Sequence, residues 1–165
     1  MIRLHSHSYE ANILEERGGN CIRLAIDGIE ALRTPDTLTD FDTENPYLYG
    51  MPLLYPPNRI SDGWFTFQER KHLFPINEPA IGCFLHGELH RTPFQVIEQS
   101  SKYVQLQYQA TTQQPYMTFP HAFTLTLAYR LNMDGLHQQA TFTNDSKQDM
   151  PVALALHNIP TSFCS

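Results

Sequence analysis

Residues 123–143 read FTLTLAYRLNMDGLHQQATFT, and this stretch decides the class of fold. Apolar and polar residues alternate over 123–131 and again over 136–143, with Asn132-Met133-Asp134-Gly135 between the two runs. Such alternation is typical of a strand with one buried face, and an Asp-Gly step favours a tight turn. The stretch therefore predicts an antiparallel β-hairpin that places one face in a core.

The same pattern extends outward from this hairpin along the rest of the chain. Further alternating runs occupy residues 9–15, 21–26, 29–34, 94–98, 103–108 and 151–157, with turn residues such as Gly18-Gly19-Asn20 and Asp27-Gly28 between them. Only residues 35–45 offer room for a helical turn or two, and their Asp and Thr content suits a loop equally. Short strands joined by such turns predict an all-β antiparallel sandwich or barrel. We expect one domain over residues 1–165.

Composition and charge exclude several classes of function. A chain of 165 residues with 41% hydrophobic residues is long enough to bury a core. Its net charge is −6 and its basic residues are scattered, which argues against a nucleic-acid partner. No apolar run approaches the roughly 20 residues needed to span a bilayer, and the first residues are too polar for a secretory signal. We expect no membrane partner and a cytoplasmic location.

The cysteines and histidines predict no metal site. Cys21, Cys83 and Cys164 are odd in number and widely spaced, which favours free thiols over a disulfide framework or a zinc knuckle. His86 and His90, if they share one strand, lie roughly 13 Å apart, too far to bind one ion.

Residues 50–87 depart from the alternating pattern. Prolines and glycines interrupt the segment, but it also carries many large apolar side chains: Leu53, Leu54, Tyr55, Trp64, Phe65, Phe67 and Phe74. So much apolar surface is incompatible with disorder. The segment predicts ordered loops packed over one face of the sheet, where binding sites commonly lie.

Three motifs along the chain resemble the aldose 1-epimerase family. They are GMPLLYPPNRI at 50–60 followed by DG at 62–63 and FTF at 65–67, LHG at 85–87 followed by PFQV at 93–96, and MPVALALH at 150–157. The motifs stand in the family's order with similar spacing, so the resemblance covers nearly the whole chain. It implies a galactose-mutarotase-like antiparallel β-sandwich, present here as an incomplete N-terminal portion because family members are roughly twice this length.

The resemblance also implies an activity and its residues. The family interconverts the α and β anomers of a free aldose by acid–base ring opening, a reaction that needs no metal or cofactor. His157 matches the acid that protonates the ring oxygen, and His86 matches a histidine that hydrogen-bonds the sugar. Arg59 matches the arginine that reaches the sugar oxygens, with Asn58 assisting.

The residues themselves leave alternatives open. His157 also suits a core-facing position at a strand end, and Arg59 also suits a salt bridge to Asp62 or Glu69. The aromatic side chains Trp64, Phe65 and Phe67 suit either stacking on a sugar or a place in the core.

Nothing in the sequence matches the family's general base, a glutamate near the C-terminus of family members. Glu69, Glu78 and Glu88 lie near the motifs but in a different context, and residues 158–165 depart from the family pattern. We therefore expect a truncated or frameshifted mutarotase chain that is inactive alone and self-associates through uncovered sheet edges or faces. A non-catalytic sugar-binding sandwich and a non-functional remnant are the alternatives. Whether the sugar is a free hexose or a hexose 6-phosphate stays open.

Overall fold

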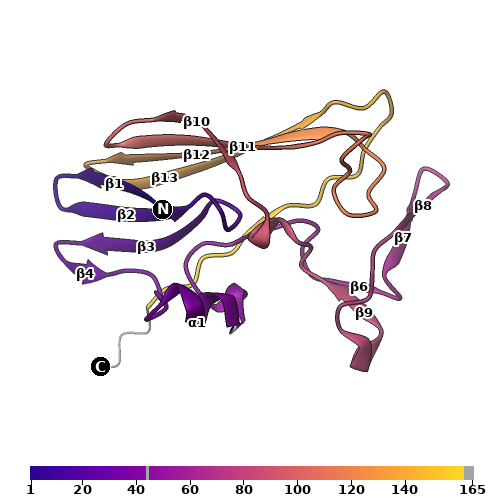
Figure 1. The fold of residues 1–165 in the computed structure, drawn as a ribbon, viewed down its shortest axis with the longest axis horizontal. Coiled ribbons are helices and arrows are strands. Elements are labelled where there is room, and N and C mark those ends of the chain that lie inside the picture. The colour runs from indigo at the N-terminus through magenta and orange to yellow at the C-terminus, as the bar shows by residue number, and fades with distance from the viewer. Residues whose placement is uncertain (44, 162–165) are drawn as a thin grey trace.

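The structure is a computed structural model that describes residues 1–43 and 45–161. One four-stranded antiparallel sheet contains β1 (Ile2–Ser6), β2 (Tyr9–Leu14), β3 (Asn20–Ile26) and β4 (Ile29–Glu30) in chain order. A second contains β10 (Gln95–Gln99), β11 (Tyr103–Ala110), β12 (Phe123–Asn132) and β13 (Gly135–Asn144). The two sheets lie against each other (Figure 1), which makes the fold an antiparallel β-sandwich.

Alternation along β12 explains how the core forms. Its buried side chains are Phe123, Leu125, Leu127, Tyr129 and Leu131, every second residue of the strand. They meet the buried side chains of β1 and β2, such as Leu4 and Ile13, in one apolar cluster. Burial of these side chains stabilises the sandwich by about 1.5–3 kcal/mol each. The buried Tyr129 hydroxyl donates a hydrogen bond of 2.7 Å to the Gly19 carbonyl, so its polar end is satisfied.

The segment between the two sheets folds into short strand pairs. β5 (Leu53–Leu54) pairs with β14 (Ala155–Leu156), β6 (Arg59–Ser61) with β9 (Cys83–Leu85), and β7 (Trp64–Phe67) with β8 (Arg70–Leu73). Figure 1 shows the β7–β8 hairpin projecting from the end of the molecule opposite the β1–β4 turns. Within the described residues, the helical pieces are α1 (Leu38–Thr43) and three short 3-10 helices: η1 (Pro46–Leu48), η2 (Pro79–Ile81) and η3 (Leu89–Arg91).

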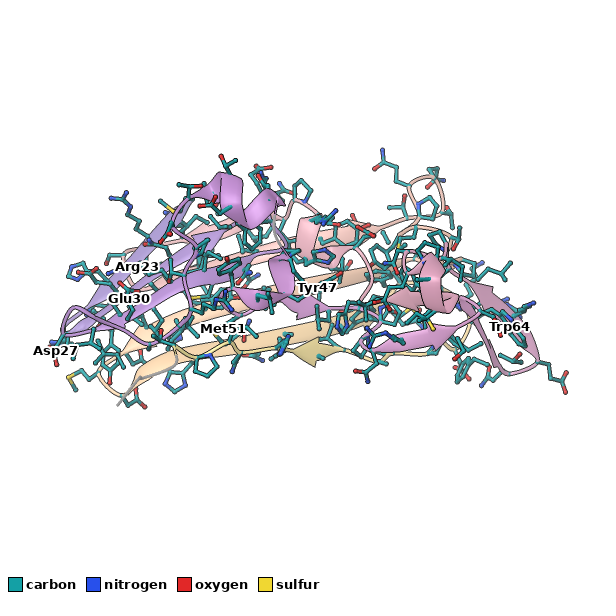
Figure 2. All side chains as sticks on the ribbon, turned by 90° about the horizontal axis from the view of Figure 1, so that it is seen from below. Arg23, Asp27, Glu30, Tyr47, Met51 and Trp64 are labelled. Carbon is teal, nitrogen blue, oxygen red and sulfur yellow. The ribbon has the colours of Figure 1, made fainter. Side chains whose placement is uncertain are left out.

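Asn20 ties this segment to the first sheet. Its buried side-chain amide donates to the Tyr49 carbonyl over 3.2 Å and accepts from the Met51 amide over 2.7 Å. The residues before β5 are thereby fixed to β3, and Met51 lies over the middle of the sandwich in Figure 2. The expected ordered packing of residues 50–87 is confirmed, since Leu53, Tyr55 and Phe74 belong to the main core.

The all-β prediction is confirmed, with differences at the ends of elements. The hairpin over 123–143 forms as β12 and β13, and a helix occupies part of 35–45. β1 was not predicted, and the strands expected over 29–34 and 151–157 are reduced to β4 and β14. Ile29–Glu30 and Ala155–Leu156 pair over only two residues because the chain beyond them pairs through isolated bridges and loop hydrogen bonds.

Two of the three cysteines lie within the described residues, and both are free and buried as expected. Burial raises the pKa of the Cys21 thiol to about 12, which makes it unreactive near neutral pH. Cys164 lies outside the described residues. None of the helices in the described ranges has the length and apolarity needed to cross a membrane.

Candidate functional site

The β6–β9 ladder brings two of the predicted residues together. Arg59 stands opposite Leu85 in the register, so Asn58 and His86 face each other just beyond the paired residues. The Asn58 amide donates to the His86 Nδ1 over 3.1 Å, and the His86 amide donates to the Asn58 carbonyl over 3.2 Å. Both residues have positive φ, 62° for Asn58 and 61° for His86. The two turns thus hold the imidazole in one orientation.

This contact fixes the proton position on His86. Because Nδ1 accepts a hydrogen bond from a backbone amide, the neutral ring carries its proton on Nε2. Burial, followed by the positive charges of His157 and Arg59, lowers the pKa of His86 below its ordinary value. His86 is therefore a neutral hydrogen-bond donor near neutral pH, a form suited to an oxygen atom of a ligand.

Arg59 is exposed and forms a two-point ion pair. Its Nε and Nη2 donate to the Glu78 carboxylate over 2.6 and 2.9 Å, which lowers the pKa of that carboxyl. The alternative partners expected from sequence, Asp62 and Glu69, are wrong. Glu78 precedes η2 and reaches Arg59 because residues 77–78 fold back onto the Cys83 carbonyl. The pair orients the guanidinium and leaves its remaining N–H groups free to donate.

His157 follows β14, which pairs with β5. Its backbone amide donates to the Pro52 carbonyl over 3.1 Å, and its side chain is exposed, so the core-facing alternative is wrong. Its charge is the second largest cause of the lowered pKa of His86. The structure therefore places His157 within electrostatic reach of His86, on an accessible surface.

Tyr47 and His90 also lie at this place, and the sequence did not predict them as residues of the site. The Tyr47 ring lies between two imidazoles, with ring centroids 4.7 Å from His86 and 4.6 Å from His90. Tyr47, Glu78 and His90 line a hollow of about 250 Å³ beside the β6–β9 ladder. Residues 47 and 86 are joined only by tertiary packing, and no local pattern connects them. Figure 2 shows Tyr47 near the middle of the molecule.

His90 is 2% exposed, and neither of its ring nitrogens has a hydrogen-bond partner. Burial, then the charges of Arg91 and His86, lowers the pKa of His90 to about 4. The strand assumed for residues 86–90 is wrong, because β9 ends at Leu85 and His90 lies in η3. Over residues 1–43 and 45–161, no three His, Cys, Asp or Glu side chains converge as metal ligands would.

Two of the three aromatic candidates, Phe65 and Trp64, have different environments. Phe65 stacks on His72 at 5.1 Å and on Phe74 at 6.0 Å, so it belongs to an aromatic cluster. Trp64 is 42% exposed with the Lys71 ammonium 4.1 Å from its ring centre. Figure 2 places Trp64 at the far end of the molecule from Asp27, well away from Tyr47.

The arrangement is chemically suited to a neutral ligand rich in oxygen atoms. Arg59 offers free N–H donors, His86 offers its Nε2–H, and His157 is an imidazole open to solvent. The Glu78 carboxylate raises the pKa of His86. The site thus provides several donors and an acid–base group, and the Glu78 carboxylate is engaged by Arg59.

The fold is a galactose-mutarotase-like antiparallel sandwich, with these donors at the ends of its short strand pairs. The sequence profile of the aldose 1-epimerase family matches residues 1–159, and the chain belongs to that family.

Solved structures show the same fold. A galactose mutarotase-like protein from Clostridium acetobutylicum is 34% identical over 94% of this chain, with a TM-score of 0.86. A galactose mutarotase-like protein from Lactobacillus casei is 23% identical over 93% of this chain, with a TM-score of 0.73. The GalM/aldose epimerase homologue from C. elegans is 20% identical over 99%, with a TM-score of 0.78. The chain spans about half of each, namely 49%, 47% and 51%.

Proposed function

We propose that this chain is an aldose 1-epimerase-type protein whose sugar site contains Arg59, His86 and Asn58, with His157 as the acid. The observation that carries the proposal is the pairing of Asn58 with His86 beside Arg59 on the β6–β9 ladder, with His157 close enough for its charge to lower the pKa of His86. Family membership supports the substrate class, a free aldose. The site uses donors only, which suits the hydroxyl and ring oxygens of a pyranose.

In the reaction of the family, ring opening proceeds by proton transfer between a base, an acid and the sugar. A base removes the proton of the C1 hydroxyl, the C1–O5 bond breaks, and C1 becomes an aldehyde as His157 gives its proton to O5. Rotation about C1–C2 and the reverse steps produce the other anomer and return both protons. His86 holds a sugar oxygen through Nε2–H, and Arg59 holds another. Proton transfer by such groups contributes about 10²–10⁴-fold in rate.

We propose that Glu78, whose charge acts on His86, is not the general base of this reaction. Glu78 raises the pKa of His86, but Arg59 lowers the pKa of Glu78 and donates to both of its carboxylate oxygens. A carboxylate held in this way is a weak proton acceptor. We therefore propose that these residues bind the sugar without accelerating its mutarotation.

The same observation favours a second candidate function, a non-catalytic carbohydrate-binding protein. Both functions use the same donors and differ only in turnover, so one measurement of rate separates them.

Polarimetry of freshly dissolved α-glucose and α-galactose tests the proposal that these residues do not accelerate mutarotation. With the 165-residue chain present, we expect the optical rotation to change at the uncatalysed rate. Acceleration that disappears in His157→Ala would contradict the proposed lack of acceleration and establish His157 as catalytic. Acceleration that survives in His157→Ala would contradict the proposed acid as well.

A further inference from the structure

A second polar cavity lies beyond the proposed sugar site. It has a volume of about 400 Å³ and is lined by residues of the β7–β8 hairpin, the segment before β12 and the segment before β14. Neither Arg59, His86 nor His157 belongs to its lining. A ligand of this cavity would therefore contact a different set of residues from those of the proposed sugar site.

Two buried histidines line this cavity and lack partners for part of their hydrogen-bonding capacity. His72 is 2% exposed and His121 is 4% exposed, and their rings stack at 5.4 Å. Nδ1 of His72 and Nε2 of His121 have no hydrogen-bond partner, whereas Nδ1 of His121 lies 3.3 Å from the Ser146 hydroxyl. An unpartnered buried polar group is costly, so a hydrogen-bond partner at either imidazole would stabilise the fold.

The charged groups around the histidines give the cavity a positive balance. Arg70 on β8 and Lys147 before β14 line it, against one carboxylate, Asp149. The Asp149 carboxylate accepts a hydrogen bond of 2.9 Å from the Gln68 amide, and the Arg70 guanidinium donates to the Gln148 side chain. Two cations and one hydrogen-bonded carboxylate leave a net positive charge beside two imidazole rings.

Without a ligand, the two histidines are held neutral. Burial, and then the charge of Arg70, lowers the pKa of His72. Burial, and then the charges of His72 and Arg70, lowers the pKa of His121. An anion in the cavity would oppose these effects, because it stabilises protonated imidazoles and accepts their N–H groups.

We propose that this cavity binds a small tetrahedral oxyanion, such as phosphate or sulfate, through Arg70, Lys147 and the imidazole rings of His72 and His121. The oxyanion would lie against the two buried rings, with the two cations toward solvent. This site does not depend on the sugar site or on turnover.

Titration of the full chain with inorganic phosphate, followed by NMR of the histidine rings, tests the proposal. At constant ionic strength and neutral pH, we expect saturable shifts at His72 and His121, with the exposed His7 unaffected. Arg70→Gln should weaken binding about tenfold, since a hydrogen bond to a charged group is lost. Lys147→Gln should also weaken it, and this variant carries the test if Arg70→Gln does not fold.

Lys71→Gln is the matched control, because Lys71 is the neighbour of Arg70 but lies over the Trp64 ring. It removes the same charge and should change the affinity by less than about twofold, as expected for a screened surface charge. Inorganic sulfate in a second titration should bind at the same two histidines. Non-saturating shifts, equal losses in Arg70→Gln and Lys71→Gln, or equal shifts with uncharged glucose would each overturn the proposal.

Discussion

Replacing Gly87 by alanine should destabilise the chain by about 4 kcal/mol, whereas the same change at Gly82 should cost about 1 kcal/mol. Both glycines have nearly the same positive φ, 65° at Gly87 and 64° at Gly82. A Cβ at Gly87 would overlap the Tyr55 carbonyl and lie 2.7 Å from the Tyr116 hydroxyl. A Cβ at Gly82 would meet nothing within 4 Å. The difference between the two variants therefore measures the clash.

The Gly87 clash has a large effect because it breaks several contacts at once. The Tyr116 hydroxyl donates to the Tyr55 carbonyl over 2.6 Å and accepts from the Glu88 amide over 2.6 Å. Urea denaturation of both variants provides the free energies of unfolding. Equal losses would mean that the backbone at Gly87 moves aside, and that these contacts do not hold the backbone around His86 in place.

Lowering the pH from 7.5 to 5 should cost about 2 kcal/mol of stability through His90 alone. In the unfolded chain this imidazole has its ordinary pKa of 6.5, whereas in the fold burial lowers the pKa to about 4. Between those values the unfolded state binds the proton and the folded state does not. The contribution of His90 to stability is thus complete above the unfolded pKa of 6.5 and is lost as the pH falls toward the folded pKa of about 4.

His90→Phe should remove this part of the pH dependence. Chemical denaturation at several pH values measures it, and the slope between pH 7 and 5 should flatten in the variant. His7→Asn is the control, because His7 is exposed and has a positive φ of 52° that asparagine tolerates. The buried His72 and His121 will leave a residual slope in both variants. A slope in His90→Phe equal to that of the unmodified chain would contradict the buried, neutral state of His90.

The main sheets were predictable from sequence because alternating apolar and polar residues indicate a strand with one buried face. β12 illustrates this, since each residue that the pattern assigned to the core is buried. β1 was missed, although Ile2 and Leu4 alternate with polar residues, because the run is short and lies at the terminus. The two-residue strands β5 and β14 depend on partners about a hundred residues apart, which no local pattern encodes.

The site was predictable only in part. Family motifs pointed to Asn58, Arg59, His86 and His157, and their assigned roles stay predictions. The ion pair of Arg59 with Glu78 and the packing of Tyr47 against His86 depend on how residues 77–78 and 46–48 fold back, and sequence spacing does not encode those contacts. Self-association likewise stays a prediction, which light scattering of the chain will check; β10 and β13 are the edge strands of their sheet.

The central claim is that Arg59, His86 and His157 form one sugar site, and a sugar titration followed at the histidine rings tests it most directly. With equilibrated galactose or glucose, we predict saturable NMR shifts at His86 and His157 with one common affinity. Arg59→Gln should weaken this affinity about tenfold, since it removes a charged hydrogen bond. Arg23→Gln is the control, because Arg23 pairs with Glu10 and Glu30 at the far end of the sandwich (Figure 2). Shifts at neither histidine, or equal losses in both variants, would contradict the claim.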